Sequence, residues 1–253
     1  MDDKSIAESL FAIAKEKIPT SGELARGAYR DSEFYEMSIA ELKRNFSRAV
    51  SNIQIEAYNR YLANERNVAA EAIKTVFFEL IHSANSNLQA LDIIADHFGA
   101  FDKFSLSLTQ SRRSRAGSAF EIIVSELFLK LGYPYSAQAN IRGSTPDYIL
   151  PSISWYNRYP SDTIILTLKR TLRERWRQIV TESSSGTFYL ATIDEDISGP
   201  GLEQMKDRNI TVVLPDAVKN EHYLKRLNVI SFEDFFEDHL DPAMARWKKK
   251  GAI

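Results

Sequence analysis

The amino-acid sequence predicts an α/β protein in which a mixed or parallel central sheet is flanked by helices and preceded by a helical N-terminal region. Apolar residues recur at spacings of three and four over much of residues 1–100, as in "AESLFAIAKEKI" and "NLQALDIIADHF". After residue 140 this pattern gives way to short β-branched runs with helical patterns between several of them. Strands that alternate with helices are typical of an α/β layer. Because the composition changes at "FGAFDKF" (98–104), we expect a domain boundary near residue 100.

Each predicted element rests on a local signal. "PTSG" (19–22) separates the first helix from the next, and "NSN" (85–87) predicts a turn. "AGSAFEIIVSELFLKLG" (116–132) predicts one amphipathic helix with Gly132 at its C-cap. Apolar runs predict strands at 146–150, 162–169, 186–193, 210–215 and 228–231. Further helices are expected at 171–183, at 201–209 and in the tail 232–250, which ends in three lysines.

Composition restricts the class of protein. The 253 residues include no cysteine, which excludes disulfides, thiolate nucleophiles and cysteine-based zinc sites. The N-terminus is acidic and amphipathic, unlike a signal peptide, and no apolar run approaches the ~20 residues that cross a bilayer. We therefore expect a cytoplasmic protein without membrane contact. The formal net charge of −2 argues against a globally basic nucleic-acid binder, but it leaves room for a local basic groove.

The stretch "TIILTLKRTLRERWRQIVTE" (163–182) changes from apolar to highly charged at Lys169. Thr171 and Glu174 fit a capping box, which predicts a helix from residue 172. Its apolar stripe, which we expect to pack on the sheet, consists of Leu172, Trp176, Ile179 and Val180.

The arginines of this stretch have two interpretations. They can form a solvated helix face with charge pairs four residues apart. However, Arg173, Arg175 and Arg177 lie near the start of the predicted helix, where the helix dipole disfavours cations. Their position therefore indicates an external anion or the edges of nucleic-acid bases as their partner.

An aspartate upstream completes a pattern with Lys169. Asp147 follows Pro146 at the start of one predicted strand, and Lys169 ends the next predicted strand. The start of one strand and the end of a neighbouring strand can converge in space. This pattern resembles that of the PD-(D/E)xK nucleases, in which carboxylates hold Mg²⁺ and a lysine orients or activates a water molecule for attack on a phosphodiester. The acid that this pattern has two positions before the lysine is replaced by Thr167 here, so the resemblance implies that Glu182, further along, supplies the second carboxylate.

These residues resemble the type II restriction endonucleases of the EcoRII, SsoII and PspGI branch, which have a PD-(D/E)xK nuclease core. "PDY" and "LKRTLRERWRQIVTE" carry the resemblance, together with "RSRAGSAFE" (113–121) and "ITVVLPDAVKNEHY" (210–223). It covers about 112–235, and the N-terminal helical half carries no motif that shows it. The resemblance implies a catalytic set of Asp147, Lys169 and Glu182, with Glu121 as an upstream acid. It also implies that Arg173, Glu174 and Arg175 read C·G pairs, although Glu174 has a competing use as a capping residue.

The resemblance implies further properties. These are Mg²⁺ as cofactor, a homodimer, double-stranded DNA with a palindromic CCNGG or CCWGG site, five-base 5′ overhangs, and a cognate DNA methyltransferase in the same system. A flipped central base pair is implied as well, and Tyr58 and Tyr61 are candidates to stack on it, with ordinary helix aromatics as the favoured alternative. The N-terminal helical region 1–100 is expected to serve DNA binding or dimerisation, and 101–253 to form the nuclease core.

Other charged residues also have two interpretations. The cluster "SRRSR" at a predicted helix start contributes Arg112, Arg113 and Arg115, which either contact DNA phosphates or form a solvated turn. Arg170 is a further candidate for a phosphate contact. Glu121 is either an acid of the metal site or an exposed helix glutamate.

We therefore predict a Mg²⁺-dependent, sequence-specific DNA endonuclease. Three alternatives remain at this point: a repair or junction nuclease with the same core, a non-catalytic DNA-binding protein, and a helical interaction protein without a DNA partner.

Overall fold

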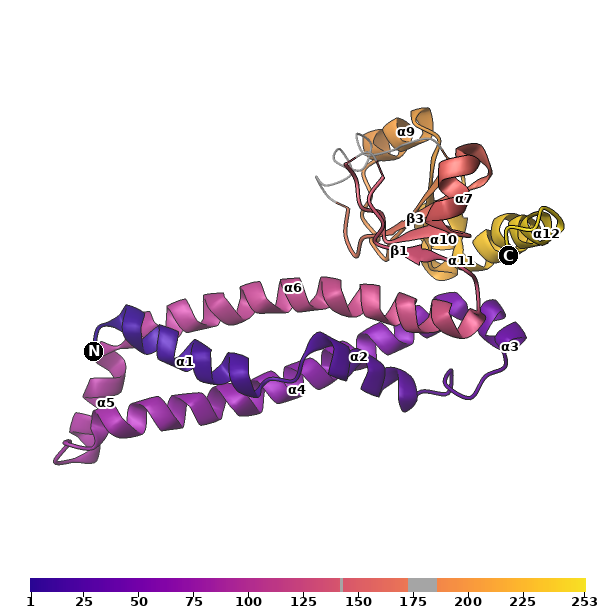
Figure 1. Ribbon diagram of the computed structural model, residues 1–253. Coiled ribbons are helices and arrows are strands. Elements are labelled where there is room, and N and C mark those ends of the chain that lie inside the picture. Colours follow the sequence, from indigo (N-terminus) through magenta and orange to yellow (C-terminus); the bar gives the residue numbers. More distant parts are fainter. Residues whose placement is uncertain (142, 173–185) are drawn as a thin grey trace. The chain divides into compact units, whose positions relative to one another are not determined.

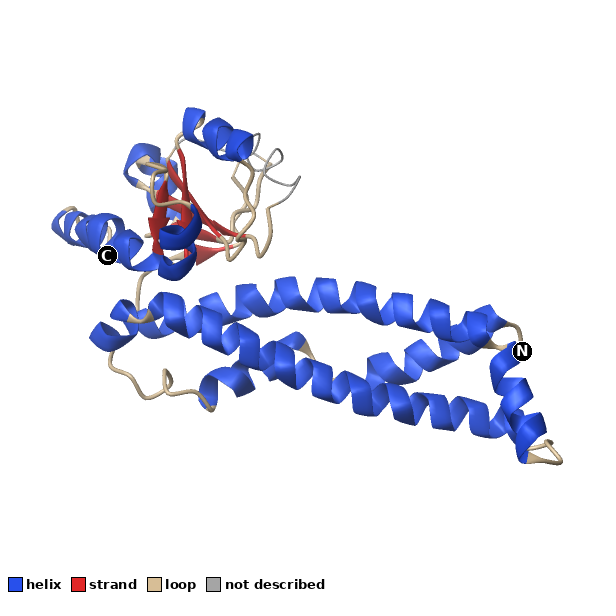
Figure 2. Cartoon of the chain, turned by 180° about the vertical axis from the view of Figure 1, so that it is seen from behind, coloured by secondary structure: helices blue, strands red, loops and turns tan. Residues whose placement is uncertain are grey.

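The computed structural model describes residues 1–141, 143–172 and 186–253 (Figures 1 and 2). Packing divides the chain into two compact units, each made from two separate segments. The helical unit consists of Met1–Ala28 and Ile55–Ala119, and the sheet unit consists of Tyr29–Gln54 and Phe120–Ile253. The chain thus changes unit after residues 28, 54 and 119, whereas the composition indicates a single boundary near residue 100.

Long helices that run side by side form most of the helical unit (Figures 1 and 2). The helices that contribute to it are α1 (Asp3–Lys17), α2 (Ser21–Arg30), α4 (Phe46–Ile81), α5 (Asn87–Asp96) and α6 (Phe98–Leu131). Their apolar stripes bury a common core that includes Leu10, Phe77 and Phe104. The predicted breaks at 19–22 and 85–87 are confirmed, because α2 begins within the first and α5 at the end of the second. In the described part of the chain, no helix is both long and apolar enough to cross a membrane.

Helix α6 is longer than the sequence predicts. It runs unbroken from Phe98 to Leu131, so the helix predicted at 116–132 is its C-terminal part. The cluster "SRRSR" lies inside this helix and not at its start, which corrects that expectation; no proline interrupts the pattern upstream of it. Gly132 has a φ of 73° and donates its N–H to the Leu129 carbonyl at 3.1 Å, which confirms the predicted C-cap.

The sheet unit contains a mixed sheet whose strands pair in sequence order. The strands are β1 (Ser136–Ala137), β2 (Tyr148–Leu150), β3 (Ile164–Leu168), β4 (Thr187–Ala191), β5 (Ile210–Leu214) and β6 (Val229–Ser231). Pairing is antiparallel from β1 to β3 and parallel from β3 to β6. Every predicted strand and the mixed sheet are confirmed. Strand β1 was not predicted, because two residues show no periodicity.

The rest of the sheet unit contains shorter helices, several of which flank the sheet (Figure 2). They are α3 (Ile39–Arg44), α7 (Ile153–Arg158), the 3₁₀-helix η1 (Pro160–Asp162), α9 (Gly199–Asp207), α10 (Asp216–His222), α11 (Phe232–Asp234), the π-helix η3 (Phe235–Leu240) and α12 (Asp241–Lys249). Every residue of β3 is buried, as expected for a strand covered on both faces. The core on one side of the sheet includes Ile165, Leu190, Val212 and Leu172. The burial of Leu172 agrees with its predicted place in an apolar stripe.

The segment Tyr29–Gln54 is an integral part of the sheet unit. The ring of Phe46 lies 5.1 Å from that of Phe232 and 4.8 Å from that of Phe236. The next residue, Ser47, donates its backbone N–H to Glu233 at 2.8 Å. Helix α3 and the first turns of α4 therefore complete the core that the C-terminal helices begin.

Candidate active site

Asp147 and Lys169 meet at the junction of β2 and β3. Tyr148, the first residue of β2, pairs with Leu166 of β3, so the preceding Asp147 lies beside the carboxyl end of β3. The backbone N–H of Leu168 donates to the Asp147 carboxylate at 2.7 Å, and Lys169 follows directly. The two antiparallel strands thus bring together the acid and the amine that are far apart in the sequence.

Glu121 of α6 joins this pair. Glu121 and Asp147 line one cavity of about 250 Å³, together with Ser125, Tyr135 and Gln138. Both carboxylates are partly buried. The structure therefore favours the interpretation of Glu121 as an acid of the site over that of an exposed helix residue.

The two carboxyl groups of this cluster are costly to ionise in the folded chain. Burial raises the pKa of Glu121, the neighbouring Asp147 raises it further, and the Lys169 ammonium partly offsets both effects. Burial also raises the pKa of Asp147, although the Leu168 N–H and Lys169 oppose this. Two carboxylates that are costly to ionise together offer the hard oxygen ligands that Mg²⁺ prefers. The residues present therefore fit such a metal ion.

Glu182, the second predicted metal ligand, lies outside the described residues. So do Arg173, Glu174, Arg175 and Arg177 and the remaining stripe residues Trp176, Ile179 and Val180. Within the described ranges there is no group of three or more His, Asp or Glu residues that could hold a metal ion. The second acid and the recognition triplet therefore stay predictions.

A hydroxyl pair links the two acid-bearing elements. The Ser125 hydroxyl donates to the Glu121 carbonyl at 2.7 Å, and the phenol of Tyr148 hydrogen-bonds to the same hydroxyl. Burial raises the pKa of Tyr148 to about 12, so its phenol is neutral and can donate. Sequence reasoning missed this pair, although the position of Tyr148 directly after Asp147 was a usable signal.

The arginines predicted to contact phosphates have different surroundings. Arg112 is engaged by the buried Glu65 of α4, with N–O distances of 2.5–3.1 Å, so its guanidinium has an internal partner. Arg115 donates to the Pro19 carbonyl at 2.5 Å and lies over the Tyr61 ring. Arg113 is exposed, and Arg170 is partly buried. Arg113 is thus the exposed arginine of the "SRRSR" cluster, whereas Arg112 and Arg115 are partly buried and have internal partners.

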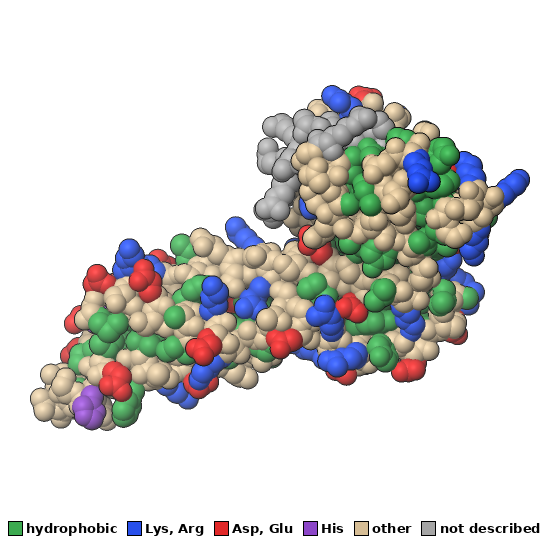
Figure 3. All heavy atoms as spheres, viewed as in Figure 1, with side chains coloured by type: hydrophobic (Ala, Val, Ile, Leu, Met, Phe, Trp, Pro, Cys, Tyr) green, Lys and Arg blue, Asp and Glu red, His purple; other side chains and the backbone are tan. Residues whose placement is uncertain are grey.

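The two tyrosines proposed to stack on a flipped base also differ. The Tyr61 side chain is 4% exposed, packs in the core of the helical unit and donates its hydroxyl to Glu65 at 2.6 Å. Its ring is not available to a base in this conformation, which agrees with the alternative interpretation as a core aromatic. Tyr58 is 43% exposed. On the face shown in Figure 3, basic and acidic side chains are interspersed along the helices, without a large patch of one sign.

A mixed sheet with an acid before β2, a lysine after β3 and an acid on the preceding helix has the architecture of the PD-(D/E)xK nucleases. A family model described as "EcoRII C terminal" matches residues 61–236, and the chain belongs to this family. This confirms the resemblance inferred from the quoted motifs.

Two curated relatives agree with this family. The chain is 32% identical over 149 residues to the type II restriction enzyme SsoII of Shigella sonnei, covering 54% of this chain and 49% of the relative. It is 31% identical over 144 residues to the type II restriction enzyme EcoRII of Escherichia coli, covering 53% and 36%. The aligned part thus spans about half or less of the length of these relatives.

Solved structures extend the likeness to the whole chain. Metal-depleted Ecl18kI in complex with uncleaved DNA superposes with a TM-score of 0.83 and 25% identity, covering 100% of this chain and 87% of that one. The PspGI–substrate DNA complex gives a TM-score of 0.60 and 23% identity, with coverages of 90% and 94%. The N-terminal helices, for which the sequence motifs indicated no resemblance, are therefore included in the structural match.

Proposed function

We propose that the chain is a Mg²⁺-dependent type II restriction endonuclease that hydrolyses double-stranded DNA at a CCNGG- or CCWGG-like palindrome. The observation that carries this proposal is that Asp147 and Glu121 line one cavity of the sheet unit, where burial raises the pKa of both carboxyl groups and the nearby Lys169 ammonium opposes this rise. Membership of the EcoRII C-terminal family and the DNA complexes among the similar structures support it.

Each residue of the site has a role in this proposal. Asp147 and Glu182 hold the metal ion, and Glu121 adds negative charge beside it. Mg²⁺, when bound, supplies stabilisation of the charge that develops on the scissile phosphate. Lys169 places the attacking water and, as a cation, compensates the two neighbouring acids. The products are a 5′-phosphate and a 3′-hydroxyl, with five-base 5′ overhangs.

Sequence recognition is assigned to the residues after Leu172. Arg173 and Arg175 donate paired hydrogen bonds to guanine O6 and N7, and Glu174 accepts from cytosine N4. Two copies of the chain, related by a two-fold axis, read the two halves of the palindrome. The N-terminal helices supply DNA or dimer contacts, and a matching methyltransferase protects the host DNA in the cytoplasm.

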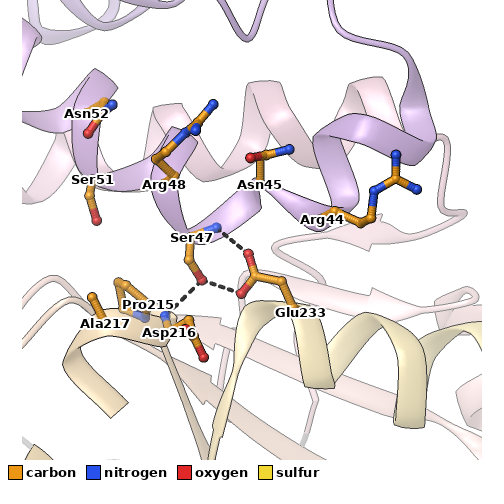
Figure 4. Close-up of a pocket in the computed structure, with 10 residues that line it drawn as sticks. All are labelled: Arg44, Asn45, Ser47, Arg48, Ser51, Asn52, Pro215, Asp216, Ala217 and Glu233. Atoms are coloured by element: carbon orange, nitrogen blue, oxygen red, sulfur yellow. Dashed lines mark hydrogen bonds between the residues drawn. The ribbon is translucent and has the colours of Figure 1, made fainter. Parts of the chain in front are cut away.

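A second cavity of the sheet unit offers a place for the flipped base. It has a volume of about 410 Å³ and is lined by Arg44, Arg48 and Asn52, among others. Figure 4 shows Ser47 bonded to Glu233 and to the Asp216 N–H, while Arg44 and Arg48 point away from this contact. The cavity lies where β5 ends, at the same edge of the parallel strands as Lys169. Guanidinium planes stack on unpaired bases, so we assign stacking to these arginines in place of Tyr61.

This assignment has a direct test. A duplex with 2-aminopurine at the central position reports extrusion as a rise in fluorescence on binding. We expect Arg48→Ala to reduce that rise and Tyr58→Ala to leave it unchanged. The opposite result would return the stacking role to Tyr58.

The function itself is tested by digestion of plasmid DNA and of short duplexes with and without CCNGG, with Mg²⁺ or EDTA. We expect cuts only at the palindrome and only with Mg²⁺, and no cuts by Lys169→Ala, which should still bind the site.

Other outcomes would support the alternatives. Cutting that follows DNA structure instead of sequence would indicate a repair or junction nuclease. Specific binding in EDTA without cutting after Mg²⁺ is added would indicate a non-catalytic binder. The absence of any salt-dependent DNA affinity would indicate a helical interaction protein without a DNA partner.

A further inference from the structure

The backbone that follows the catalytic lysine is fastened to the segment after β4. Lys169 donates its N–H to the Ala191 carbonyl at 2.9 Å, which extends the β3–β4 pairing by one residue. The Thr192 hydroxyl donates to the Arg170 carbonyl at 3.1 Å. The Asp194 carboxylate accepts the N–H of Leu172 at 2.7 Å. The chain from Lys169 to Leu172 is therefore fixed at three points.

Asp194 is itself held in place. Its N–H donates to the Thr192 hydroxyl at 3.1 Å, and its second carboxylate oxygen accepts the Asp196 N–H at 3.2 Å. The buried phenol of Tyr223 braces the same loop, since it accepts the Ile197 N–H at 2.7 Å and donates to the Glu195 carbonyl at 2.8 Å. The acidic loop, which the sequence motifs left without a function, is thus a rigid support.

The negative charge of Asp194 is favourable at the start of the helix that the sequence predicts from residue 172. Leu172 is where the sequence predicts a helix to begin, and arginines follow at residues 173, 175 and 177. A carboxylate at a helix start satisfies a free N–H and is favoured by the helix dipole, whereas those arginines are disfavoured. The predicted capping box of Thr171 and Glu174 would satisfy the N–H groups of those two residues, whereas the Leu172 N–H is taken by a carboxylate from another loop.

We propose that Asp194, supported by Thr192, is a positioning residue that couples catalysis to base recognition. It fixes the backbone between Lys169 and the residues that follow Leu172, so that the lysine and the base-reading side chains keep one geometry. This inference rests on the proposed function. The role assigned to Asp194 involves neither metal binding nor a contact with DNA; Asp194 acts through the backbone that it holds.

The test compares Asp194→Ala with Asp196→Ala. Asp196 is an exposed carboxylate of the same loop, so the two variants have the same change in net charge. Single-turnover cleavage is measured on the cognate duplex and on duplexes with one C·G pair replaced. For Asp194→Ala we expect about tenfold slower cognate cleavage and about tenfold lower discrimination between the two duplexes. Asp194→Asn keeps an oxygen acceptor and should recover part of both. Asp196→Ala should match the unmodified protein.

A second readout does not depend on cleavage. Hydrogen exchange of peptides that contain Leu172, measured without DNA, should accelerate in Asp194→Ala and not in Asp196→Ala. If the unmodified protein cuts no duplex, the proposed function fails, and the exchange result alone decides whether Asp194 fixes this backbone. Unchanged exchange would overturn the inference, and so would an unchanged discrimination ratio in Asp194→Ala.

Discussion

At the scale of single residues, the site is built from groups that are unfavourable for the fold. Asp147 and Glu121 are partly buried beside each other, and Lys169 compensates only part of the cost. A carboxyl group with a raised pKa binds its proton more tightly in the folded chain than in the unfolded chain. Its contribution to stability is therefore present at low pH and is lost as the pH rises through the folded-state pKa. Such costs are common where residues are selected for chemistry.

We predict that Asp147→Asn raises the thermal stability of the metal-free protein at neutral pH, because the neutral amide removes a buried charge. The gain should shrink as the pH falls toward and below the unfolded-state pKa near 3.8, because Asp147 then becomes protonated in both the folded and the unfolded state of the unmodified protein. Thermal unfolding in EDTA at several pH values measures this. Asp238→Asn, which changes an exposed aspartate of the same unit, should give no such gain. A lower melting temperature for Asp147→Asn would show that its hydrogen bond outweighs its burial.

Replacement of the neighbouring arginines Arg112 and Arg113 should affect different properties, namely stability for Arg112 and DNA affinity for Arg113. Arg112→Met leaves the Glu65 carboxylate, 5% exposed, without its main partner. We expect a loss of about 2 kcal/mol, below the roughly 3–5 for fully buried pairs, because the Arg112 side chain is 39% exposed. Arg113→Met should leave stability unchanged and lower DNA affinity with a reduced salt slope. Urea unfolding and binding at several salt concentrations separate the two roles, and equal stability losses would contradict this assignment.

At the scale of elements, hydrophobic periodicity was sufficient for the strands and for the end of α6. Residues 164–168 are apolar except for the buried Thr167, as expected for a strand that is covered on both faces, and Gly132 supplies the positive φ at the end of α6. The start of α6 could not be predicted. The sequence of residues 98–115 is compatible with the first turns of a helix and equally with a boundary between two domains. The two residues of β1 form a strand because they pair with β2, and the local sequence contains no signal for it.

The hydroxyl pair of Ser125 and Tyr148 joins α6 to β2, and its loss should affect both stability and metal binding. Tyr148→Phe removes the phenol that bonds Ser125, so Glu121 and Asp147 should be held less firmly relative to each other. We expect a loss of about 1 kcal/mol in stability and a several-fold higher Mg²⁺ concentration for half-maximal cleavage. Tyr133→Phe is the matched control, because its buried phenol bonds Asp241 at 2.6 Å and it does not line the acidic cavity.

Tyr133→Phe should lose a comparable stability without any change in Mg²⁺ dependence. A Mg²⁺ titration of both variants at a temperature where both remain folded distinguishes positioning from general destabilisation. Equal Mg²⁺ requirements in the two variants would remove the role assigned to the Tyr148 hydroxyl.

At the scale of the whole molecule, the proximity of Asp147 and Lys169 was easier to predict than the division of the chain. Asp147 and Lys169 could be paired from the sequence because strand order and a short connection bring them together. Glu121 was found through resemblance, with two interpretations left open; its partial burial near Asp147 argues against an exposed helix residue, and its role at the metal site stays a prediction. Contacts such as that of Ser47 with Glu233 join residues 186 positions apart, and no local pattern encodes them.

These distant contacts yield a prediction about fragments. A fragment that begins at residue 101, the boundary indicated by composition, lacks Tyr29–Gln54 and hence part of the sheet unit. It would expose the faces of Phe232 and Phe236 that Phe46 covers and leave Glu233 without Ser47. We expect this fragment to lack cooperative unfolding and to bind apolar dyes, because several buried aromatic contacts are lost together.

A matched fragment tests the reason for this failure. Joining residues 29–54 through a flexible Gly/Ser linker to residues 120–253 restores every segment of the sheet unit and omits the helical unit. We expect this fragment to unfold cooperatively, whereas replacement of Phe46 by Ala within it should again reduce stability by roughly 3 kcal/mol. Near-ultraviolet circular dichroism and urea unfolding of the three fragments measure these differences. If the fragment from residue 101 folds as well as the joined one, Tyr29–Gln54 is dispensable, and the nuclease core is the C-terminal segment alone.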